Sequence, residues 1–456
     1  MRHCRLFNTV SEFNEAYNGE QYEEPWVSVT DGDASGRVNY NKTEREKLLG
    51  TQLTFKITSG GNIKWKANRS SSAKEIQYSI NGGEWTSVTS TTAGVPISVA
   101  ANDVVKFKSS VFPAGNSFTY TTAGFELDGN IMSLGGGSGF ASLTEIAQAS
   151  AFTGLFWSCT GLTDASKLLL PATTLANYCY SSMFSGCTSL TTAPELPATT
   201  LAERCYYQMF QDCTSLTTAP AILPATTLAD CCCVSMFQRC RRLTTAPQLP
   251  ATTLAKNCYQ YMFSECTSLT TAPELPAMTS VQFCYNSMFS GCTSLTTAPE
   301  LPATTLVMYC YAYMFQGCTS LTTAPAILPA TTLATACCHS MFAGCTNLTT
   351  TPALPATTLA DGCYYNMFQG CTSLTTAPEL PSTTLAKSCY YQMFNGCTSL
   401  NYIKAMFTTT PSTSYTSNWV SGVASSGTFV KNSAATWNVT GNDGVPTGWT
   451  VETASE

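Results

Sequence analysis

A Met-Phe pair recurs at nearly constant spacing through the second half of this chain. The pairs end at Phe184, Phe210, Phe237, Phe263, Phe289, Phe315, Phe342, Phe368 and Phe394, and Leu155-Phe156 is a degenerate predecessor. Successive phenylalanines are 28, 26, 27, 26, 26, 26, 27, 26 and 26 residues apart. A fixed period in this range is the mark of a stacked array, because one unit is too short to bury a core alone. Residues 150–400 are therefore predicted to form a solenoid.

Within one unit, apolar residues recur every four positions. The unit at residues 190–216 reads LTTAPELPATTLAERCYYQMFQDCTSL, in which Leu201, Cys205, Met209 and Cys213 share this spacing. The spacing predicts one face of an amphipathic helix. The β-branched Leu-Thr-Thr-Ala-Pro segment predicts one short strand. We therefore expect an α/β solenoid of about ten 26–28-residue strand-helix units, which curves into a horseshoe because helices are wider than strands.

The repeat consensus, LxxAxxLPxxTLAxxCYxxMFxGCTSL, resembles the BspA-like leucine-rich repeat family of gut Bacteroidales over about residues 150–400. The F-x-G-C-T-S-L core and the Leu-Pro step carry the resemblance. An extra Cys-Tyr turn makes these units longer than the commoner family repeat. The resemblance implies a leucine-rich-repeat solenoid and a role in adhesion.

Nineteen of the 23 cysteines fall on two ladders, one three residues after each phenylalanine and one four residues before each methionine. A disulfide ladder, a metal cluster at Cys231, Cys232 and Cys233, and simple core packing all compete as interpretations. Equivalent side chains in a stack point in parallel, which is poor disulfide geometry, and the Cys231–Cys233 run lacks the spacing of a zinc site. Packing of small, weakly polar side chains is favoured. The structural ladder comprises Cys187, Cys213, Cys240, Cys266, Cys292, Cys318, Cys345 and Cys371.

Two units carry an inserted apolar residue near Ile222 and Ile327, and in the same units the ladder tyrosine becomes Cys233 or Cys338. This coincidence suggests a compensation in which the isoleucine fills the volume that the tyrosine vacates.

The regions outside the repeat differ in composition. We expect an anchoring segment at 1–48, an immunoglobulin-like antiparallel β-sandwich at 49–134, a Gly-rich hinge at 135–149 and a C-terminal cap at 401–456. Asn81-Gly82 predicts a hairpin turn within the sandwich. Trp419, Trp437 and Trp449 are interpreted as packing in the cap, with a sugar-binding platform as the alternative.

The N-terminal stretch YEEPWVSVT…RVNYNK resembles the opening of tail and fibre proteins from phages of gut Bacteroidales. This resemblance implies that residues 1–48 attach to other virion proteins, with Pro25, Trp26 and Tyr40 as candidate anchor residues. The repeats would then face outward. The first twenty residues lack the apolar core of a signal peptide, which favours a virion protein made in the bacterial cytoplasm over an exported one.

The composition argues against several functions. Histidine occurs twice, and acidic residues within the repeats form a broken ladder rather than converging pairs, so we expect no enzyme and no cofactor or metal. The net charge of −6 disfavours a nucleic-acid partner. The apolar runs are too short for a membrane span.

Binding is the more credible role. Candidate ligand contacts are aromatic residues at variable repeat positions and one basic cluster: Tyr207, Tyr261, Tyr313, Tyr365, Tyr391, Arg239, Arg241 and Arg242. The repeated Thr-Thr pairs add hydroxyls that suit a glycan or protein partner. The alternative is that tyrosines pack between units and threonines stabilise the strand ladder.

The sequence thus favours a non-enzymatic virion structural protein that presents its repeats for contact with a host-surface glycan or protein. Two alternatives remain: a bacterial BspA-like surface adhesin, and an intracellular scaffold that binds a protein partner. A homo-oligomer is compatible with each of them.

Overall fold

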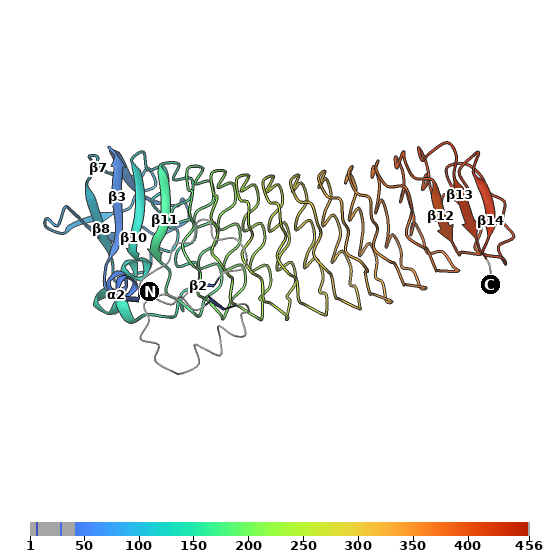
Figure 1. The fold of residues 1–456 in the computed structure, drawn as a ribbon. Coiled ribbons are helices and arrows are strands. Elements are labelled where there is room, and N and C mark those ends of the chain that lie inside the picture. Colours follow the sequence, from blue (N-terminus) through green and yellow to red (C-terminus); the bar gives the residue numbers. More distant parts are fainter. Residues whose placement is uncertain (1–5, 8–27, 30–41, 455–456) are drawn as a thin grey trace.

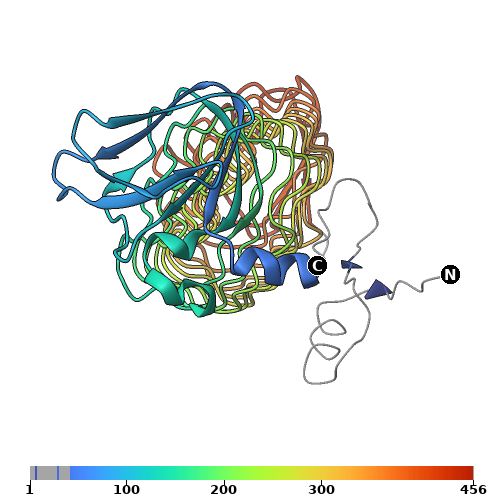
Figure 2. The same ribbon diagram turned by 90° about the vertical axis from the view of Figure 1, so that its left-hand side faces the viewer.

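The computed structural model describes residues 6–7, 28–29 and 42–454. The molecule is an elongated rod in which successive coils of chain stack in a single row (Figure 1). Seen along the rod, the coils superimpose on one another (Figure 2). A β-domain lies at the N-terminal end of the rod and a small parallel sheet at the other. The row is extended and lacks the expected horseshoe curvature.

The N-terminal β-domain contains two sheets. The six-stranded sheet has the order β11-β10-β3-β8-β5-β6, and the other has the order β7-β4-β9. Asn81 and Gly82 have φ of 51° and 75°, and they join β5 to β6 as the predicted hairpin turn. The immunoglobulin-like classification stays a prediction. The strands are β3 Leu53–Ser59, β4 Gly61–Ala67, β5 Glu75–Ile80, β6 Thr86–Thr89, β7 Val95–Val99, β8 Val104–Lys108, β9 Asn116–Ser117, β10 Gly124–Asn130 and β11 Leu162–Leu169.

The segment before this domain is described only in part. The strands β1 (Leu6–Phe7) and β2 (Ser28–Val29) pair in parallel, and α2 spans Lys42–Leu49. The candidate anchor residues Pro25, Trp26 and Tyr40 lie outside the described residues.

Where a Gly-rich hinge was expected, the structure has ordered packing. The buried 3-10 helix η1 (Ile131–Leu134) follows β10 and precedes the predicted hinge at 135–149, and within the hinge range η2 (Gly137–Ser142) buries Phe140. Strand β10 pairs in parallel with β11, which belongs to the first coils of the stack. The β-domain and the solenoid therefore share one sheet and one hydrophobic core.

The prediction of a helix in each repeat is wrong. Residues 201–213 form successive tight turns, and the second residue of each outward-facing pair has a positive φ: 53° at Arg204, 55° at Gln208 and 60° at Asp212. The Met209 N–H donates to the Tyr206 carbonyl three residues earlier (3.1 Å). Because the turns repeat every four residues, they place the same side chains inward as a helix does over this length, so the pattern alone did not separate the two.

The remaining backbone groups join one coil to the next. The Tyr206 N–H donates to the carbonyl of Cys232 in the following coil (2.9 Å), and Phe210 donates to Met236 (2.9 Å). Turn bonds and inter-coil bonds alternate along the chain, which satisfies the buried backbone polar groups. The expected strand is likewise reduced to single parallel bridges, such as Thr192 with Thr218. Without helices on one side, the stack has no reason to curve strongly.

A continuous stack of phenylalanine rings runs along the core. The rings from Phe156 to Phe394 stack with centroids 5.3–5.8 Å apart and interplanar angles of at most 17°. At the N-terminal end, Phe118 of the β-domain stacks on Phe156 at 5.9 Å. The β-domain therefore caps one end of the repeat core.

The other end is closed by the predicted tryptophans. Phe394 N–H donates to the Trp419 carbonyl (2.8 Å), so one more coil follows Cys397, where we expected the period to break. Trp419, Trp437 and Trp449 are all buried, and their indole N–H groups donate to backbone carbonyls. This packing excludes the sugar-platform alternative for these residues. A parallel sheet of β12 (Tyr402–Ala405), β13 (Thr428–Lys431) and β14 (Thr450–Thr453) lies at this end of the rod.

The proposed compensation between isoleucine and tyrosine is also wrong. Ile327 is 41% exposed, and Ile222 does not line the small cavity beside Cys233, between Tyr206 and Tyr259. The backbone of each isoleucine instead forms a bridge with the next coil, Ile222 with Gln248 and Ile327 with Ala353. The inserted residue therefore widens the edge of the coil, and the missing tyrosine leaves a void.

Candidate binding surface

The cysteine ladder is a set of buried hydrogen-bond donors. Each Sγ of the structural ladder donates to the carbonyl of the phenylalanine in the preceding coil at 3.0–3.2 Å, as Cys266 does to Phe237. The same side chains have no exposed surface. A cysteine at this position therefore fills a narrow core slot and adds a weak inter-coil hydrogen bond.

Burial also makes these thiols unreactive. It raises the pKa of Cys318 and of Cys397 to about 12, so both stay protonated near neutral pH. Within the run Cys231–Cys233, Cys232 and Cys233 are buried, whereas Cys231 is partly exposed. The described residues contain no cluster of three or more His, Cys, Asp or Glu side chains suited to a metal ion.

Native-state alkylation tests this account. In a Cys4→Ser background, iodoacetamide at pH 8 is expected to label Cys231 in the folded protein and the ladder cysteines only after unfolding in urea. The physical reason is that the folded ladder thiols are both inaccessible and protonated. Mass spectrometry of tryptic peptides gives the site of labelling. Rapid labelling of Cys266 or Cys318 in the native protein contradicts the prediction.

Each coil presents three outward pairs of residues, which together form what we call the outer side. In the coil of Phe210 these pairs are Glu203-Arg204, Tyr207-Gln208 and Gln211-Asp212, and the pairs Cys205-Tyr206 and Met209-Phe210 between them point into the core. Equivalent positions in successive coils form rows along the rod. The variable residues of the repeat therefore lie together on one surface.

Seven ring side chains on the outer side form an aromatic strip across six coils. Its members are Tyr261, Phe283, Tyr309, Tyr313, His339, Tyr365 and Tyr391. Phe283 stacks on Tyr309 at 5.2 Å, and His339 on Tyr365 at 4.5 Å. Tyr365 in turn stacks on Tyr391 at 4.3 Å, and the Tyr313 ring lies 4.9 Å from His339. Burial among these rings raises the pKa of Tyr313 and lowers that of His339.

The strip contains four of the five candidate tyrosines. Tyr207 occupies the same row as Tyr391, but its neighbours in that row are Ser181 and Val234, so it lies apart. The ligand contacts predicted from the sequence did not include His339. The available signal was its position three residues before Phe342, which matches Tyr365 and Tyr391 relative to their own phenylalanines.

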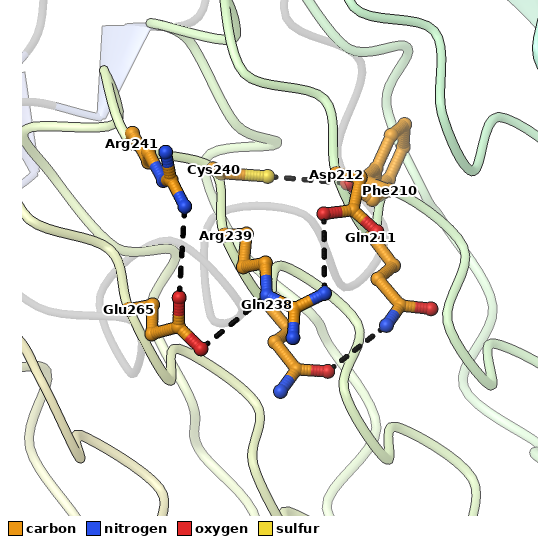
Figure 3. Close-up of polar contacts among 8 residues, drawn as sticks. All are labelled: Phe210, Gln211, Asp212, Gln238, Arg239, Cys240, Arg241 and Glu265. Atoms are coloured by element: carbon orange, nitrogen blue, oxygen red, sulfur yellow. Dashed lines mark hydrogen bonds and ion pairs between the residues drawn. The ribbon is translucent and has the colours of Figure 1, made fainter.

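The basic cluster is largely neutralised by acidic residues of adjacent coils (Figure 3). Arg239 lies between Asp212 (3.5 Å) and Glu265 (3.3 Å), and Arg241 also contacts Glu265 (3.7 Å). The hydrogen bond that the Arg239 guanidinium donates to the Glu265 carboxylate raises the pKa of Arg239. Arg242 is exposed beside them. An anion-binding role for this cluster stays a prediction. The ion pairs of Arg239 and Arg241 weaken this prediction, because they already neutralise both side chains.

The repeated threonines hold the coils together. The Thr191 hydroxyl donates to the Thr163 carbonyl of the preceding coil (2.9 Å), and Thr217 donates to Thr191 (3.1 Å). Equivalent bonds recur at Thr322 and Thr349. This agrees with the alternative in which threonines stabilise the ladder, although these side chains remain exposed.

Two residues of the acidic ladder contact neighbouring coils. Glu300 accepts a bond from the Ala326 N–H (3.3 Å), and Glu379 pairs with Lys404 (3.0 Å). Both contacts join neighbouring coils. Over residues 42–454, none of the helices is long and apolar enough to cross a bilayer.

Comparison with known proteins finds one family that matches part of the repeats. The family model for the BspA type leucine rich repeat region, in six copies, matches residues 233–349 and 328–418. These residues resemble BspA type repeats. A crystal structure of a leucine-rich repeat protein from Bacteroides ovatus ATCC 8483 matches at 16% identity, over 69% of this chain and 88% of that chain, with a TM-score of 0.26. A TM-score this low carries no argument. The search of curated proteins returned no match.

The family match supports the BspA-like resemblance of the repeats over residues 233–418. The phage-like resemblance of residues 1–48 is not shown by it and stays a prediction.

Proposed function

We propose that this chain is a non-enzymatic binding protein, a BspA-like adhesin or scaffold, that holds a macromolecular partner against the aromatic strip. The BspA-like repeats support this class of function, because such repeats typically serve binding rather than catalysis. The observation that carries the proposal is the strip itself, a cluster of partly exposed aromatic rings on the outer side.

The strip is not needed to build the coil. Tyr261, Phe283, Tyr309 and Tyr313 all have φ between 56° and 58°, a region that favours glycine or asparagine. Such a conformation costs about 1–2 kcal/mol for a bulky residue. Other coils place Asn366 and other small residues at equivalent positions. Large rings kept at strained positions that are exposed or partly exposed indicate a function for their surface.

The composition of the strip favours a polypeptide partner. Three consecutive coils, those of Phe289, Phe315 and Phe342, carry no Asp, Glu, Lys or Arg on the outer side. Exposed Met308 lies in the middle of them, and charged residues flank them on either side. A centre of aromatic residues and one methionine, with a charged rim, is the usual anatomy of a protein interface. Stacked rings also cover one another's faces, which leaves few open faces for a sugar ring.

The virion role was the first expectation from the sequence, and it remains a proposal. It rests on residues 1–48, most of which are outside the described residues, and no feature of the repeats favours it over the adhesin or scaffold role. Detection of the protein in purified phage particles is the measurement that supports it.

Binding assays on the full chain test the proposed function. We expect the wild type to bind immobilised protein or glycan probes on paired protein and glycan arrays, with protein probes preferred. The variant Tyr365→Ser/Tyr391→Ser is expected to lose at least about tenfold in affinity, since buried tyrosines dominate such interfaces. Tyr207→Ser is the matched control, from the same row but outside the strip. Equal loss in the control, or no effect in the double variant, contradicts the proposal.

A further inference from the structure

We infer that the aromatic strip is a self-complementary surface, which a second copy of this chain occupies in antiparallel orientation. This inference rests on the proposed function, because it names a partner for the same strip. It is carried by the order of charges along one row of the outer side.

The row lies seven residues before each phenylalanine. In chain order it reads Glu203, Asp230, Lys256, Gln282, Met308, Thr335, Asp361 and Lys387. Lys256 and Asp361 therefore lie two coils from Met308, one on each side. Asp230 and Lys387 lie three coils from it, again one on each side, and each pair has opposite charges. Asp230, Lys256, Asp361 and Lys387 are exposed. Among the described residues, no ion pair involves any of these four.

A twofold axis through the coil of Phe315, perpendicular to the rod and lying in the interface, reverses the order of coils and keeps each row opposite itself. Lys256 of one copy then faces Asp361 of the other, and Asp230 faces Lys387. Each pair occurs twice by symmetry, so four opposite-charge contacts surround a charge-free centre at Met308. Such a rim sets orientation and register more than it adds affinity.

Other arrangements of two copies fit less well. A parallel dimer, with its twofold axis along the rod, reverses the order of the rows, so this row either faces another row or, if it lies on the axis, brings Asp230 against Asp230. Neither opposite-charge pair forms in it. Moving the axis by one coil, to Phe289, places Glu203 opposite Asp361. Like charges across an interface are unfavourable. Of these three arrangements, only the antiparallel one about Phe315 brings opposite charges together in both pairs.

The sizes of the remaining side chains also complement one another. In the row six residues before phenylalanine, Phe283 faces Ala336. In the row three residues before phenylalanine, Tyr365 faces Gln260, and Tyr391 faces Val234. In each of these three contacts a large ring therefore meets a smaller side chain. This alternation allows two copies to pack closely.

Sedimentation equilibrium on the full chain tests the inference. The wild type is expected to form a dimer, and Met308→Glu to raise its dissociation constant at least about tenfold, because two carboxylates then meet on the axis. Met278→Glu introduces the same charge at a more exposed methionine away from the outer side, and it should leave the dimer unchanged. Far-UV circular dichroism and the urea midpoint verify that each variant folds.

Charge exchange distinguishes this dimer from any other. Lys256→Asp is expected to weaken the dimer about tenfold, and Lys256→Asp/Asp361→Lys to restore it to within about threefold of the wild type, since the pair is exchanged but complementary. A monomeric wild type, an unaffected Met308→Glu dimer, or no rescue by the double exchange each overturns the inference. The array assays read the proposed function separately: a monomer that still binds probes through Tyr365 and Tyr391 contradicts the dimer and leaves the binding role standing.

Discussion

Replacing Phe289 with alanine is expected to lower the free energy of unfolding by about 3–5 kcal/mol. Phe289 has no exposed surface and lies in the middle of the ring stack, 5.7 Å from Phe263 and 5.6 Å from Phe315. Truncation removes both stacking contacts and leaves a cavity that the inter-coil hydrogen bonds prevent from collapsing. Because each coil contacts only its neighbours, the loss also uncouples the two halves of the solenoid.

Urea unfolding followed by circular dichroism measures this effect. Phe283→Ala is the matched control, since the same side chain is removed from the partly exposed strip, where Phe283 stacks on Tyr309. We expect the control to cost less than about 1.5 kcal/mol. A Phe289→Ala protein that unfolds at the same urea concentration as the wild type contradicts the account of the core.

The sequence predicted which residues lie inside the solenoid, but not the local backbone. The Met-Phe period located every coil up to Phe394, and the cysteine ladders proved to be buried core slots. The four-residue spacing was read as a helix because helix and successive turns differ by only 0.4 residue per repeat. What separates them is where each N–H donates, to its own coil or to the next, and no single-unit pattern contains that information.

The glycine that follows the repeat phenylalanine by two residues is compatible with two backbone structures, a helix end or a tight turn. A glycine two residues after phenylalanine would suit the end of a helix. In the structure, Gly344 has φ of +76° and is the last of three positive-φ positions in its coil. A Cβ at Gly344 would lie 3.7 Å from the Cα of Gly317 in the neighbouring coil, so close stacking is tolerated there. The strain of φ, rather than crowding, explains the glycine.

The sequence predicted individual members of the aromatic strip, but not that they lie together. Tyr313, Tyr365 and Tyr391 stood out as variable aromatics, but their grouping depends on which positions of neighbouring coils touch. That requires the outward pairs to be known. His339 shows this most clearly. Cys338 and Ser340 flank it in the sequence, whereas its ring contacts Tyr313 and Tyr365 in the structure.

The second large effect is expected at the end of the stack. Trp419→Ala should lower the free energy of unfolding by about 3–5 kcal/mol, because Trp419 closes the repeat core. Its ring contacts Phe394 at 6.1 Å and Phe407 at 5.9 Å, and its indole N–H donates to the Gly444 carbonyl at 2.9 Å. The substitution removes the ring and leaves that buried carbonyl without this donor, which adds to the cost of the cavity.

This loss should also be localised, which gives the prediction a second measurement. Since a solenoid unfolds from a weakened end, hydrogen exchange is expected to speed up first in β12, β13 and β14 and only later near Phe289. Trp85→Ala is the control, because Trp85 is 36% exposed in the β-domain, and its loss should leave exchange at the C-terminal end unchanged. Uniform acceleration along the whole rod in the Trp419→Ala protein would show that the coils unfold as one unit, and that Trp419 is not a local cap.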